Sequence, residues 1–345
     1  MKILVTGTDG YLGSVLAPRL LAAGHQLTCV DTGFYADGLL FGEEPVLRTI
    51  KKDIRHLNEE DLAGHHAVVH MAELSNDPTG ELAPDITYKI NHQASVRLAT
   101  LAKKAGVSKF VYMSSCSVYG VGTGDFVTET SPVNPQTAYA ICKTFVERDV
   151  SPLADSTFSP VFLRNATAYG ASQRMRFDIV LNNLSGLAHT IKTIAMLSDG
   201  TPWRPLVHAQ DIAAAIETVL AADPSQIHNE VFNVGDTKHN YQVRDIAEFV
   251  AAEYPDCQLT FGALPSDNRS YRVSFDKIHE RFPHYVCEWD AAKGARQLRT
   301  LFDTIPLTTE LFQAHPFTRL KALEKLIREG RIDSDFFWKT PAAAL

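Results

Sequence analysis

Short apolar runs alternate with longer segments of helical periodicity through the first half of the chain. The apolar runs are rich in β-branched and aliphatic residues and predict strands at Ile3–Thr6, Gln26–Val30, Ala67–His70, Lys109–Ser114 and Pro160–Arg164. The segments between them predict helices at Gly10–Ala23, Pro84–Ala105 and Gln136–Asp149. Strands that alternate with helices in this way are typical of βαβ units. The pattern therefore predicts an α/β fold built on a parallel sheet.

The pattern becomes less regular after Asn165. A turn-rich loop at Asp199–Pro205 precedes a predicted helix at Gln210–Ala222 and a short strand at Val231–Val234. From Tyr241 onward helical patterns dominate. We expect a nucleotide-binding core from about the first 165 residues, with a smaller, helix-rich part that covers the ligand.

Composition narrows the class of protein. Of the 345 residues, 45% are hydrophobic and 21% are charged, as in an ordinary globular protein. The net charge of −7 argues against a nucleic-acid partner, because phosphate neutralisation needs a basic surface. No apolar run reaches the roughly 20 residues of a membrane span, and no signal peptide is expected. The five cysteines are odd in number and form no CxxC pair, which predicts a cytoplasmic location with neither disulfides nor a zinc site.

A glycine-rich loop lies between the first predicted strand and the first predicted helix. In Thr6-Gly-Thr-Asp-Gly-Tyr-Leu-Gly13 the glycines Gly7, Gly10 and Gly13 follow a GxxGxxG spacing. Such a loop needs small residues for its tight turn, for close approach of a diphosphate and for helix–strand packing. The free N–H groups and the dipole of the following helix favour the same anion. The loop therefore predicts a dinucleotide site.

Three further segments fit the same site. Asp31 follows the second strand, 24 residues after Gly7. A carboxylate at this position accepts hydrogen bonds from the ribose hydroxyls and repels a 2′-phosphate, so NAD is favoured over NADP. Asp53-Ile54 is expected to bracket the adenine. His70-Met-Ala72 ends a strand at the edge of the sheet where ligands bind. We expect His70 itself to be a packed strand-end histidine without a chemical role.

A serine, a tyrosine and a lysine form the candidate catalytic group. Tyr139 and Lys143 lie four residues apart, on one face of a predicted helix. A free phenol has a pKa of about 10, and a neighbouring ammonium together with a nicotinamide cation favours the phenolate that acts as a base. Ser115 directly follows the preceding predicted strand and is expected to orient the reacting oxygen.

In this order the motifs resemble those of the extended short-chain dehydrogenase/reductases, specifically the NAD-dependent nucleotide-sugar epimerase/dehydratase family. The resemblance extends to about Phe302. It implies a Rossmann-type, doubly wound parallel sheet in residues 1–170, to which residues 205–235 return. Residues 171–204 and 236–330 would form a sugar-nucleotide domain, and residues 331–345 would form a tail. It also implies a homodimer formed through helices Pro84–Ala105 and Gln136–Asp149.

The resemblance assigns site residues position by position. The cofactor residues would be Gly7, Gly10, Tyr11, Leu12, Gly13, Asp31, Asp53, Ile54, Met71, Ala72, Asn91, Tyr139 and Lys143. The substrate residues would be Ser75, Ser117, Asn165, one of Asn182 and Asn183, and the diphosphate arginines Arg204 and Arg269. The tail beyond Leu307 has no assigned function, and its aromatic residues are expected to pack on the body or on a partner chain.

The pair of residues after Ser115 bears on the reaction. Dehydratases of this family carry an Asp-Glu pair there, and decarboxylases carry a glutamate at the second place. This chain has Cys116 and Ser117, and neither protonates a leaving hydroxyl at neutral pH. We therefore expect a nucleoside-diphosphate sugar substrate and C4 epimerisation through a 4-keto intermediate. The alternatives are a 4-ketosugar reductase, a dehydratase or decarboxylase, and a catalytically idle NAD-binding regulator.

Overall fold

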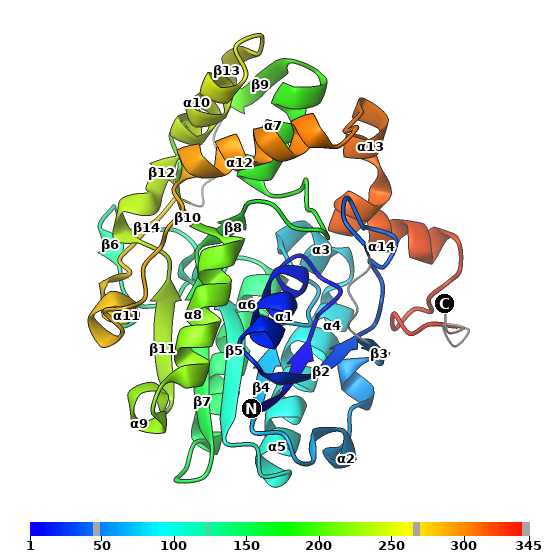
Figure 1. Cartoon of the computed structure of the whole chain (residues 1–345), viewed down its shortest axis with the longest axis vertical. Helices are drawn as coiled ribbons and strands as arrows, with labels where there is room; N and C mark the ends of the chain where they lie inside the picture. The colour runs from blue at the N-terminus through cyan, green and yellow to red at the C-terminus, as the bar shows by residue number, and fades with distance from the viewer. Residues whose placement is uncertain (44–48, 123, 265–269, 340–345) are drawn as a thin grey trace.

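A seven-stranded, all-parallel sheet forms the centre of the protein (Figure 1). The computed structural model describes residues 1–43, 49–122, 124–264 and 270–339. The strand order is β11-β7-β5-β4-β1-β2-β3. These strands are β1 Lys2–Thr6, β2 Gln26–Asp31, β3 Thr49–Lys51, β4 Ala67–His70, β5 Lys109–Ser115, β7 Ser159–Asn165 and β11 Glu230–Val234. All six strands predicted from the sequence are present. β3 was not predicted, because it is short and its residues are at least partly exposed.

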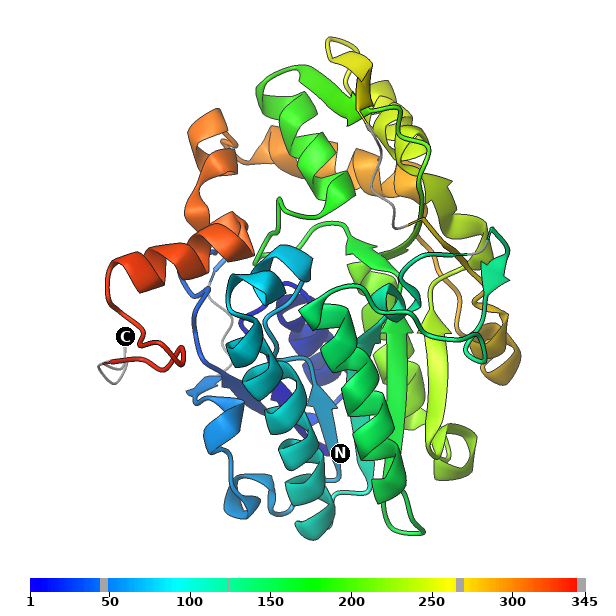
Figure 2. The ribbon, with the colours of Figure 1, turned by 180° about the vertical axis from the view of Figure 1, so that it is seen from behind.

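Helices cover both faces of this sheet, because successive residues of each strand point to opposite sides. Ile3 and Val5 of β1 pack in one cluster with α1 and α8, whereas Leu4 packs in the other with α5 and α6. Figures 1 and 2 show these two helical layers from opposite sides. The helices of this part are α1 Gly13–Ala22, α2 Glu59–Leu62, α3 Asp77–Leu82, α4 Pro84–Thr87, α5 Ser95–Lys104, α6 Ala138–Val150 and α8 Ala209–Ala221.

The helix predicted over Pro84–Ala105 is not uniform. It consists of α4, a π-helical turn at Tyr88–Ala94, and α5. The apolar stripe gave the correct extent of the helix, but periodicity does not register the extra residue per turn that a π-helix inserts. Such turns often occur beside functional sites. Here the turn carries Asn91.

A smaller unit lies beyond the carboxyl ends of the strands, at the top of Figure 1. It is built from α7 Val180–Thr190, α10 Val243–Glu253 and α12 Ala291–Thr304, with strands β9 Thr193–Ser198 and β13 Gln258–Leu264 paired in parallel. Three short strands, β8 Thr167–Tyr169, β10 Trp203–His208 and β12 Asn240–Gln242, form a second small sheet. β6 Phe126–Val127 and β14 Arg272–Val273 form a third. Short helix α11 Asp276–Arg281 packs against β11, and short helix α9 Pro224–Ile227 packs against β7 at the opposite end of the molecule from the smaller unit.

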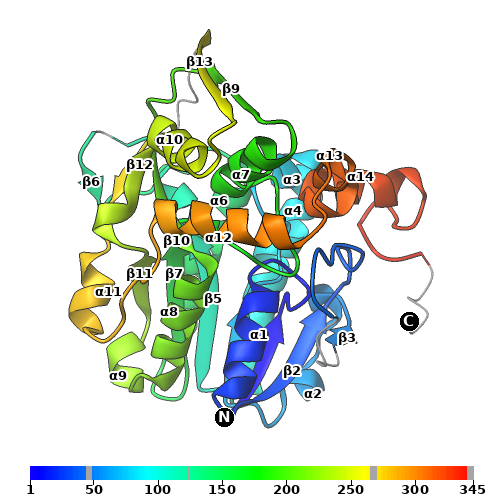
Figure 3. The same ribbon diagram turned by 45° about the horizontal axis from the view of Figure 1, so that its top comes forward.

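The C-terminal segment returns to the sheet. After α13 Thr309–Gln313, helix α14 Arg319–Arg328 lies against α3 (Figure 3). Its Leu323 is buried in the same cluster as α5, and Phe336 further along joins that cluster. Trp338 donates from Nε1 to the carbonyl of Thr32 at 2.8 Å. The aromatic residues of the tail thus pack on the body of the chain. Over the described residues, no helix combines the length and apolarity that crossing a membrane requires.

Candidate active site

A cavity of about 820 Å³ lies at the carboxyl ends of the strands, between the sheet and the smaller unit. Its floor is the glycine loop with the ends of β2, β4, β5 and β7. Arg204 and Tyr271 line it from the smaller unit, and Thr318–Leu320 line it from the C-terminal segment. This edge is where parallel α/β sheets bind their ligands. All three candidate catalytic residues, Ser115, Tyr139 and Lys143, line this one cavity.

The glycine loop is packed too tightly for side chains. Gly7 has a φ of +81°, and its N–H donates to the carbonyl of Val30 at 2.8 Å. A Cβ added to Gly13 would lie 2.2 Å from the carbonyl oxygen of Gly7. Since α1 begins at Gly13, its free N–H groups lie at the cavity. Tyr11 and Leu12 line the cavity as well, so the five loop residues predicted from the sequence lie together at its wall.

Asp31 lies at the cavity where the second strand ends. Its Oδ1 accepts the N–H of Gly33 at 2.8 Å and its Oδ2 accepts the N–H of Asp9 at 3.1 Å. Burial raises the pKa of Asp31, and the nearby Asp9 carboxylate raises it further. The Asp31 carboxylate at the cavity would repel a 2′-phosphate, and it keeps lone pairs for ribose hydroxyls. The glycine loop and Asp31 together fit a dinucleotide of the NAD type.

The other predicted cofactor residues share this half of the cavity. Asp53 and Ile54 line it, and the Asp53 carboxylate also pairs with Arg55, with Oδ2 2.8 Å from Nη2. Met71 and Ala72 line it at the end of β4. The backbone N–H groups of both donate to Thr6 Oγ1 at 3.2 Å.

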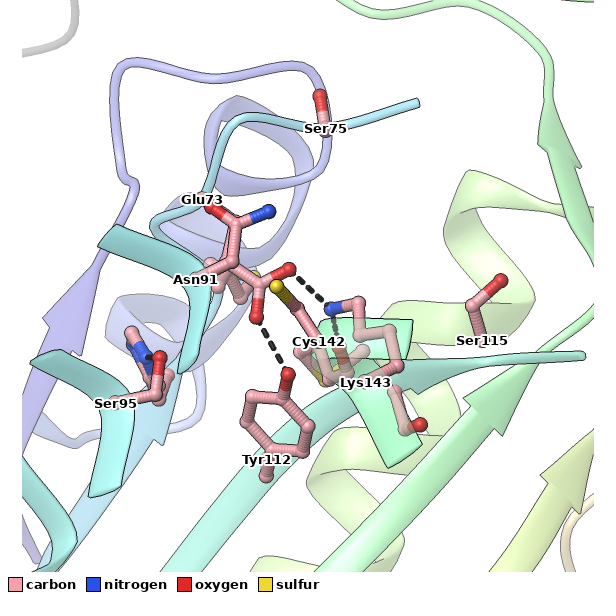
Figure 4. A network of polar contacts seen from close by, with 12 residues as sticks. Glu73, Ser75, Asn91, Ser95, Tyr112, Ser115, Cys142 and Lys143 are labelled. Atoms are coloured by element: carbon pink, nitrogen blue, oxygen red, sulfur yellow. Dashed lines mark hydrogen bonds and ion pairs between the residues drawn. The ribbon is translucent and has the colours of Figure 1, made fainter. Parts of the chain in front are cut away.

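Tyr139 and Lys143 lie on one face of α6, with Lys143 Nζ 5.3 Å from the centre of the Tyr139 ring. Lys143 is buried and forms an ion pair with Glu73, Nζ to Oε2 2.5 Å (Figure 4). It also donates to the carbonyl of Met113. The other oxygen of Glu73, Oε1, accepts from the Tyr112 hydroxyl at 2.6 Å. Lys143 is therefore fixed in place by two acceptors at the inner end of the cavity.

Competing charges set the proton affinity of the Tyr139 hydroxyl. Burial raises the pKa of Tyr139 above its ordinary value, and the carboxylates of Glu73 and Asp77 raise it further. Lys143 and Arg176 lower it, but by less than burial and the two carboxylates together raise it. Lys143 thus acts in the direction expected from the sequence, whereas the chain's own groups together favour the phenol. A cation added beside this ring would shift the balance toward phenolate.

Ser115 lies at the end of β5, and its hydroxyl oxygen accepts the N–H of Ser117 at 3.1 Å. Both serines line the cavity. Cys116 between them points the other way, is 1% exposed, and donates from Sγ to the carbonyl of Arg164 at 3.2 Å. Burial raises the pKa of this thiol well above its ordinary value. Cys116 is therefore a packed side chain and provides no acid to the cavity.

Three of the predicted substrate residues, Ser75, Asn165 and Arg204, also line the cavity. Ser75 Oγ accepts from Arg176 Nη1 at 3.1 Å. The amide nitrogen of Asn165 donates to the carbonyls of Ser114 and Leu163, each at 3.1 Å. Its amide oxygen has no hydrogen-bond partner among the described residues and faces a site of ligand size. Arg269 lies outside the described residues.

Three predicted asparagines are not at the cavity wall, which corrects the expectation that they touch ligand. Asn91 is fully buried, and its amide accepts the N–H and donates to the carbonyl of Leu74, so it holds the loop that carries Glu73 and Ser75. Asn182 accepts from Gly170 N and donates to Tyr11 Oη and Arg176 O. Asn183 donates to Phe177 O. The amides of Asn91 and Asn182 are thus bonded within the protein at both the oxygen and the nitrogen, whereas Asn183 is bonded through its nitrogen alone.

His70 is packed at the end of β4, as the sequence predicted. Its Nδ1 lies 2.7 Å from Thr6 Oγ1 and its Nε2 lies 2.8 Å from Ser95 Oγ. Burial, together with the charge of Lys143, lowers the pKa of His70 to about 3. The ring is therefore neutral and both nitrogens are engaged.

Sequence reasoning missed several charged residues that line this cavity, among them Glu73, Arg176 and Arg319. Glu73 directly follows the His70–Ala72 segment. An acidic residue just after a buried strand could have been recognised from the sequence as a candidate site residue. Arg176 lies in the segment after β8, and Arg319 lies in the tail, where no motif pointed to ligand. Arg176 forms a two-bond pair with Asp178, Nε to Oδ1 2.9 Å and Nη2 to Oδ2 3.0 Å.

Comparisons with known proteins agree with the motifs. The family model for the NAD dependent epimerase/dehydratase family matches residues 3–235. A UDP-glucose 4-epimerase from Corynebacterium glutamicum is 29% identical over 265 residues, covering 72% of this chain and 79% of its own length. A UDP-N-acetyl-alpha-D-glucosaminuronate decarboxylase from Bacillus cytotoxicus is 25% identical over 330 residues, covering 91% of this chain and 92% of its own.

The fold has close counterparts among solved structures. An NAD-dependent NDP-hexosamine 5,6-dehydratase involved in tunicamycin biosynthesis superimposes with a TM-score of 0.78 at 23% identity, covering 89% of this chain and 99% of its own. At this identity the likeness concerns the Rossmann-type fold and not the reaction.

Proposed function

The chain belongs to the NAD dependent epimerase/dehydratase family, whose model spans residues 3–235, and we propose that it is a nucleotide-sugar 4-epimerase. NAD is its cofactor, as the glycine loop and Asp31 predicted. The substrate would be a nucleoside-diphosphate hexose. The proposal is supported by similarity to UDP-glucose 4-epimerases and by the absence of an acid in both positions after Ser115.

Bound NAD supplies the acceptor and donor of hydride at C4 of the sugar. Tyr139 takes the proton of the C4 hydroxyl and later returns a proton to the same oxygen. Lys143 stabilises the phenolate and is held for this by Glu73 and the Met113 carbonyl. Ser115 bonds the C4 oxygen and keeps it in line with Tyr139. Ser75, Ser117 and Asn165 contact the sugar, and Arg204 contacts its diphosphate.

One observation carries this proposal: Tyr139 and Lys143 share a cavity whose serine-rich edge offers hydroxyls and no carboxylic acid. The side chains that face the sugar from that edge are Ser115 and Ser117, while Cys116 is turned into the core. Oxidation and reduction at one carbon need only the tyrosine base. Elimination of water also needs an acid for the leaving hydroxyl.

Glu73 favours a second candidate, a nucleotide-sugar dehydratase. Its carboxyl group lines the same cavity from the β4 side, and burial raises its pKa against the opposing effect of Lys143. A carboxyl with a raised pKa is suited to acid–base work. However, both Glu73 oxygens are bonded to the protein, by Lys143 and Tyr112, which is the arrangement of a positioning group.

The test is product analysis with a panel of nucleoside-diphosphate hexoses. An epimerase converts a substrate to an isomer of the same mass without net consumption of NADH, whereas a dehydratase product has lost water. Tyr139→Phe is expected to lower turnover by about a hundredfold or more, because the base is lost. Release of water or carbon dioxide, stoichiometric use of NADH, or full turnover by Tyr139→Phe would each contradict the epimerase.

We further propose that the chain works as a cytoplasmic homodimer. All five cysteines are free, which suits a reducing compartment. The outer helical layer of α4, α5 and α6 (Figure 2) corresponds to the pair of helices through which this family was expected to dimerise.

A further inference from the structure

The C-terminal segment lies outside residues 3–235, to which the family model is matched, yet it contributes to the wall of the cavity. Helix α14 begins at Arg319 and points its N-terminus at the cavity, where Thr318, Arg319 and Leu320 are lining residues. Figure 3 shows α14 beside α3 and near the loop that follows β2. The segment therefore reaches the half of the cavity that contains the glycine loop and Asp31.

Arg319 is a buried cation without a carboxylate partner. It is 2% exposed, and its guanidinium lies 4.1 Å from the centre of the Tyr35 ring. Its polar contacts are two long ones, from Nη1 to Pro316 O and from Nη2 to Arg174 O, both 3.4 Å. Within the described part of the chain, no carboxylate forms an ion pair with it. Burying a guanidinium in this state is unfavourable unless an anion completes the site.

The carboxylates that act on Arg319, those of Asp178 and Asp31, offset its charge only in part. Arg176 is neutralised by Asp178, and the same carboxylate accepts the backbone N–H of Arg319 at 3.3 Å. Burial and the charge of Arg176 lower the pKa of Arg319 to about 10, which reflects how poorly its charge is compensated. The N-terminus of the ten-residue helix α14 adds a partial positive charge at the same place. A guanidinium and a helix N-terminus together form an anion site.

We propose that Arg319 binds a phosphate of the NAD diphosphate, so that the C-terminal segment holds the dinucleotide against the glycine loop. Tyr35, the ring under the guanidinium, comes four residues after Asp31, which places Arg319 on the adenosine side of the cavity. The segment is anchored on the same side, because Trp338 bonds Thr32. Arg204, the candidate for the sugar-nucleotide diphosphate, comes from β10 of the smaller unit. The segment would thus slow the release of NAD.

The test measures NAD binding in the full-length chain without any sugar nucleotide, comparing Arg319→Met with the wild type. We expect the dissociation constant of NAD to rise about tenfold to a hundredfold, the effect of one charged hydrogen bond. Arg319→Lys keeps the charge and is expected to fall between the two. Arg328→Gln removes the same charge from an exposed position on α14 and should change the affinity by less than about twofold.

A second readout separates ligand binding from a structural role. Arg319→Met should leave the Tm of the NAD-free protein unchanged or higher, because a poorly compensated buried charge is replaced by an apolar side chain of similar length. The rise in Tm on adding NAD should shrink. A parallel fall in Tm with and without NAD, at unchanged NAD affinity, would overturn the proposal.

A third result would reassign the residue. If Arg319→Met binds NAD normally but the NAD-loaded protein loses affinity for nucleoside diphosphates, then Arg319 serves the sugar nucleotide and the NAD assignment is wrong. These measurements do not involve turnover. They therefore test the role of Arg319 separately from the proposed 4-epimerase activity.

Discussion

Glu73 is the residue with the largest unexpected effect on the candidate catalytic group. Its carboxylate is buried against Lys143, and a buried ion pair of this kind fixes geometry more than it adds stability. Burial lowers the pKa of Lys143, but Glu73 and Tyr139 more than offset this, so the pKa of Lys143 lies above its ordinary value. The same carboxylate opposes ionisation of Tyr139. Glu73 therefore keeps the lysine charged and the tyrosine protonated.

Glu73→Gln is expected to move the pH profile of kcat/KM to lower pH on both limbs. Without the carboxylate, the pKa of Tyr139 falls, since Lys143 and Arg176 then act against only burial and Asp77. The pKa of Lys143 falls as well, because its counter-charge is gone. The acid limb reports the tyrosine and the alkaline limb reports the lysine, so the optimum shifts toward acid. The measurement is kcat/KM across the pH range in which the enzyme stays folded.

Tyr112→Phe is the matched control for this prediction. It removes the hydroxyl that donates to Glu73 and leaves the carboxylate and its pair with Lys143 in place. We expect a much smaller movement of both limbs. If Glu73→Gln left both limbs where they are in the wild type, Glu73 would have no influence on the proton affinity of Tyr139.

The residues that could be predicted were those whose neighbours are local. Gly7, Gly13 and Asp31 belong to one strand–loop–helix–strand unit, and their spacing alone indicates their positions. Glu73 meets Lys143 only because β4 and β5 are adjacent in the sheet and α6 packs against β5. No spacing along the chain encodes that contact. The sequence therefore predicted the loop and the tyrosine–lysine pair but not the acid beside the lysine.

At the scale of elements, Asn182 joins α7 to the glycine loop. Its amide bonds Gly170 N, Tyr11 Oη and Arg176 O, and the Tyr11 hydroxyl in turn donates to Gly170 O at 2.7 Å. This buried network ties the first helix of the smaller unit to the loop before α1. A fully bonded network in a dry site makes the elements rigid, and an unpaired group left in it is costly.

Asn182→Ala and Asn183→Ala form a matched pair that tests this role. Asn182 is fully buried with three partners, whereas Asn183 is half-buried with one, the carbonyl of Phe177. We expect Asn182→Ala to lower the free energy of unfolding by about 1–3 kcal/mol, and Asn183→Ala by less than about 1 kcal/mol. Denaturant midpoints of both variants measure the difference. Equal losses would mean that the network does not join the two elements.

The elements themselves were largely predictable. Strands buried on both faces appear in the sequence as continuous apolar runs, which is why β1, β4 and β5 were found nearly to the residue. The π-helical turn at Tyr88–Ala94 was not found, because an apolar stripe is compatible with it. β3 was missed because an exposed edge strand of three residues has too few buried positions to form a pattern.

At the scale of the whole molecule, segments distant in sequence complete the central sheet and the wall of the cavity. Residues 230–234 return to the edge of the sheet, and the C-terminal segment crosses to the opposite side beside α3. The apolar run predicted the strand at Val231–Val234, and the family resemblance implied its return to the sheet. The position of the C-terminal helix was not predicted, since its sequence is that of an ordinary amphipathic surface helix. Whether a segment packs on a distant part of the chain depends on how well the two surfaces fit each other. The periodicity of apolar residues along the sequence does not describe that fit.

Assembly is the last property at this scale. Tyr88, His92 and Phe145 form an aromatic cluster between the π-helical turn and α6, with ring centres 6.3 Å apart for Tyr88 and Phe145 and 5.3 Å for His92 and Phe145. All three side chains are partly exposed on the outer helical layer. Large aromatic side chains at such a place are typical of the centre of an interface.

We therefore expect light scattering to give the wild-type chain twice the mass of a monomer. The Phe145→Glu variant should be monomeric, because its charge would be desolvated at the centre of the interface. Phe126→Glu is the control, since Phe126 is 43% exposed on β6, on a different part of the surface. It should remain a dimer. The far-ultraviolet circular dichroism of both variants should match the wild type, which separates dissociation from unfolding. A wild-type chain that is monomeric at micromolar concentration would exclude the dimer. A Phe145→Glu variant that stays dimeric would place the interface elsewhere, because a dimer formed through this helix pair has to bury the aromatic cluster.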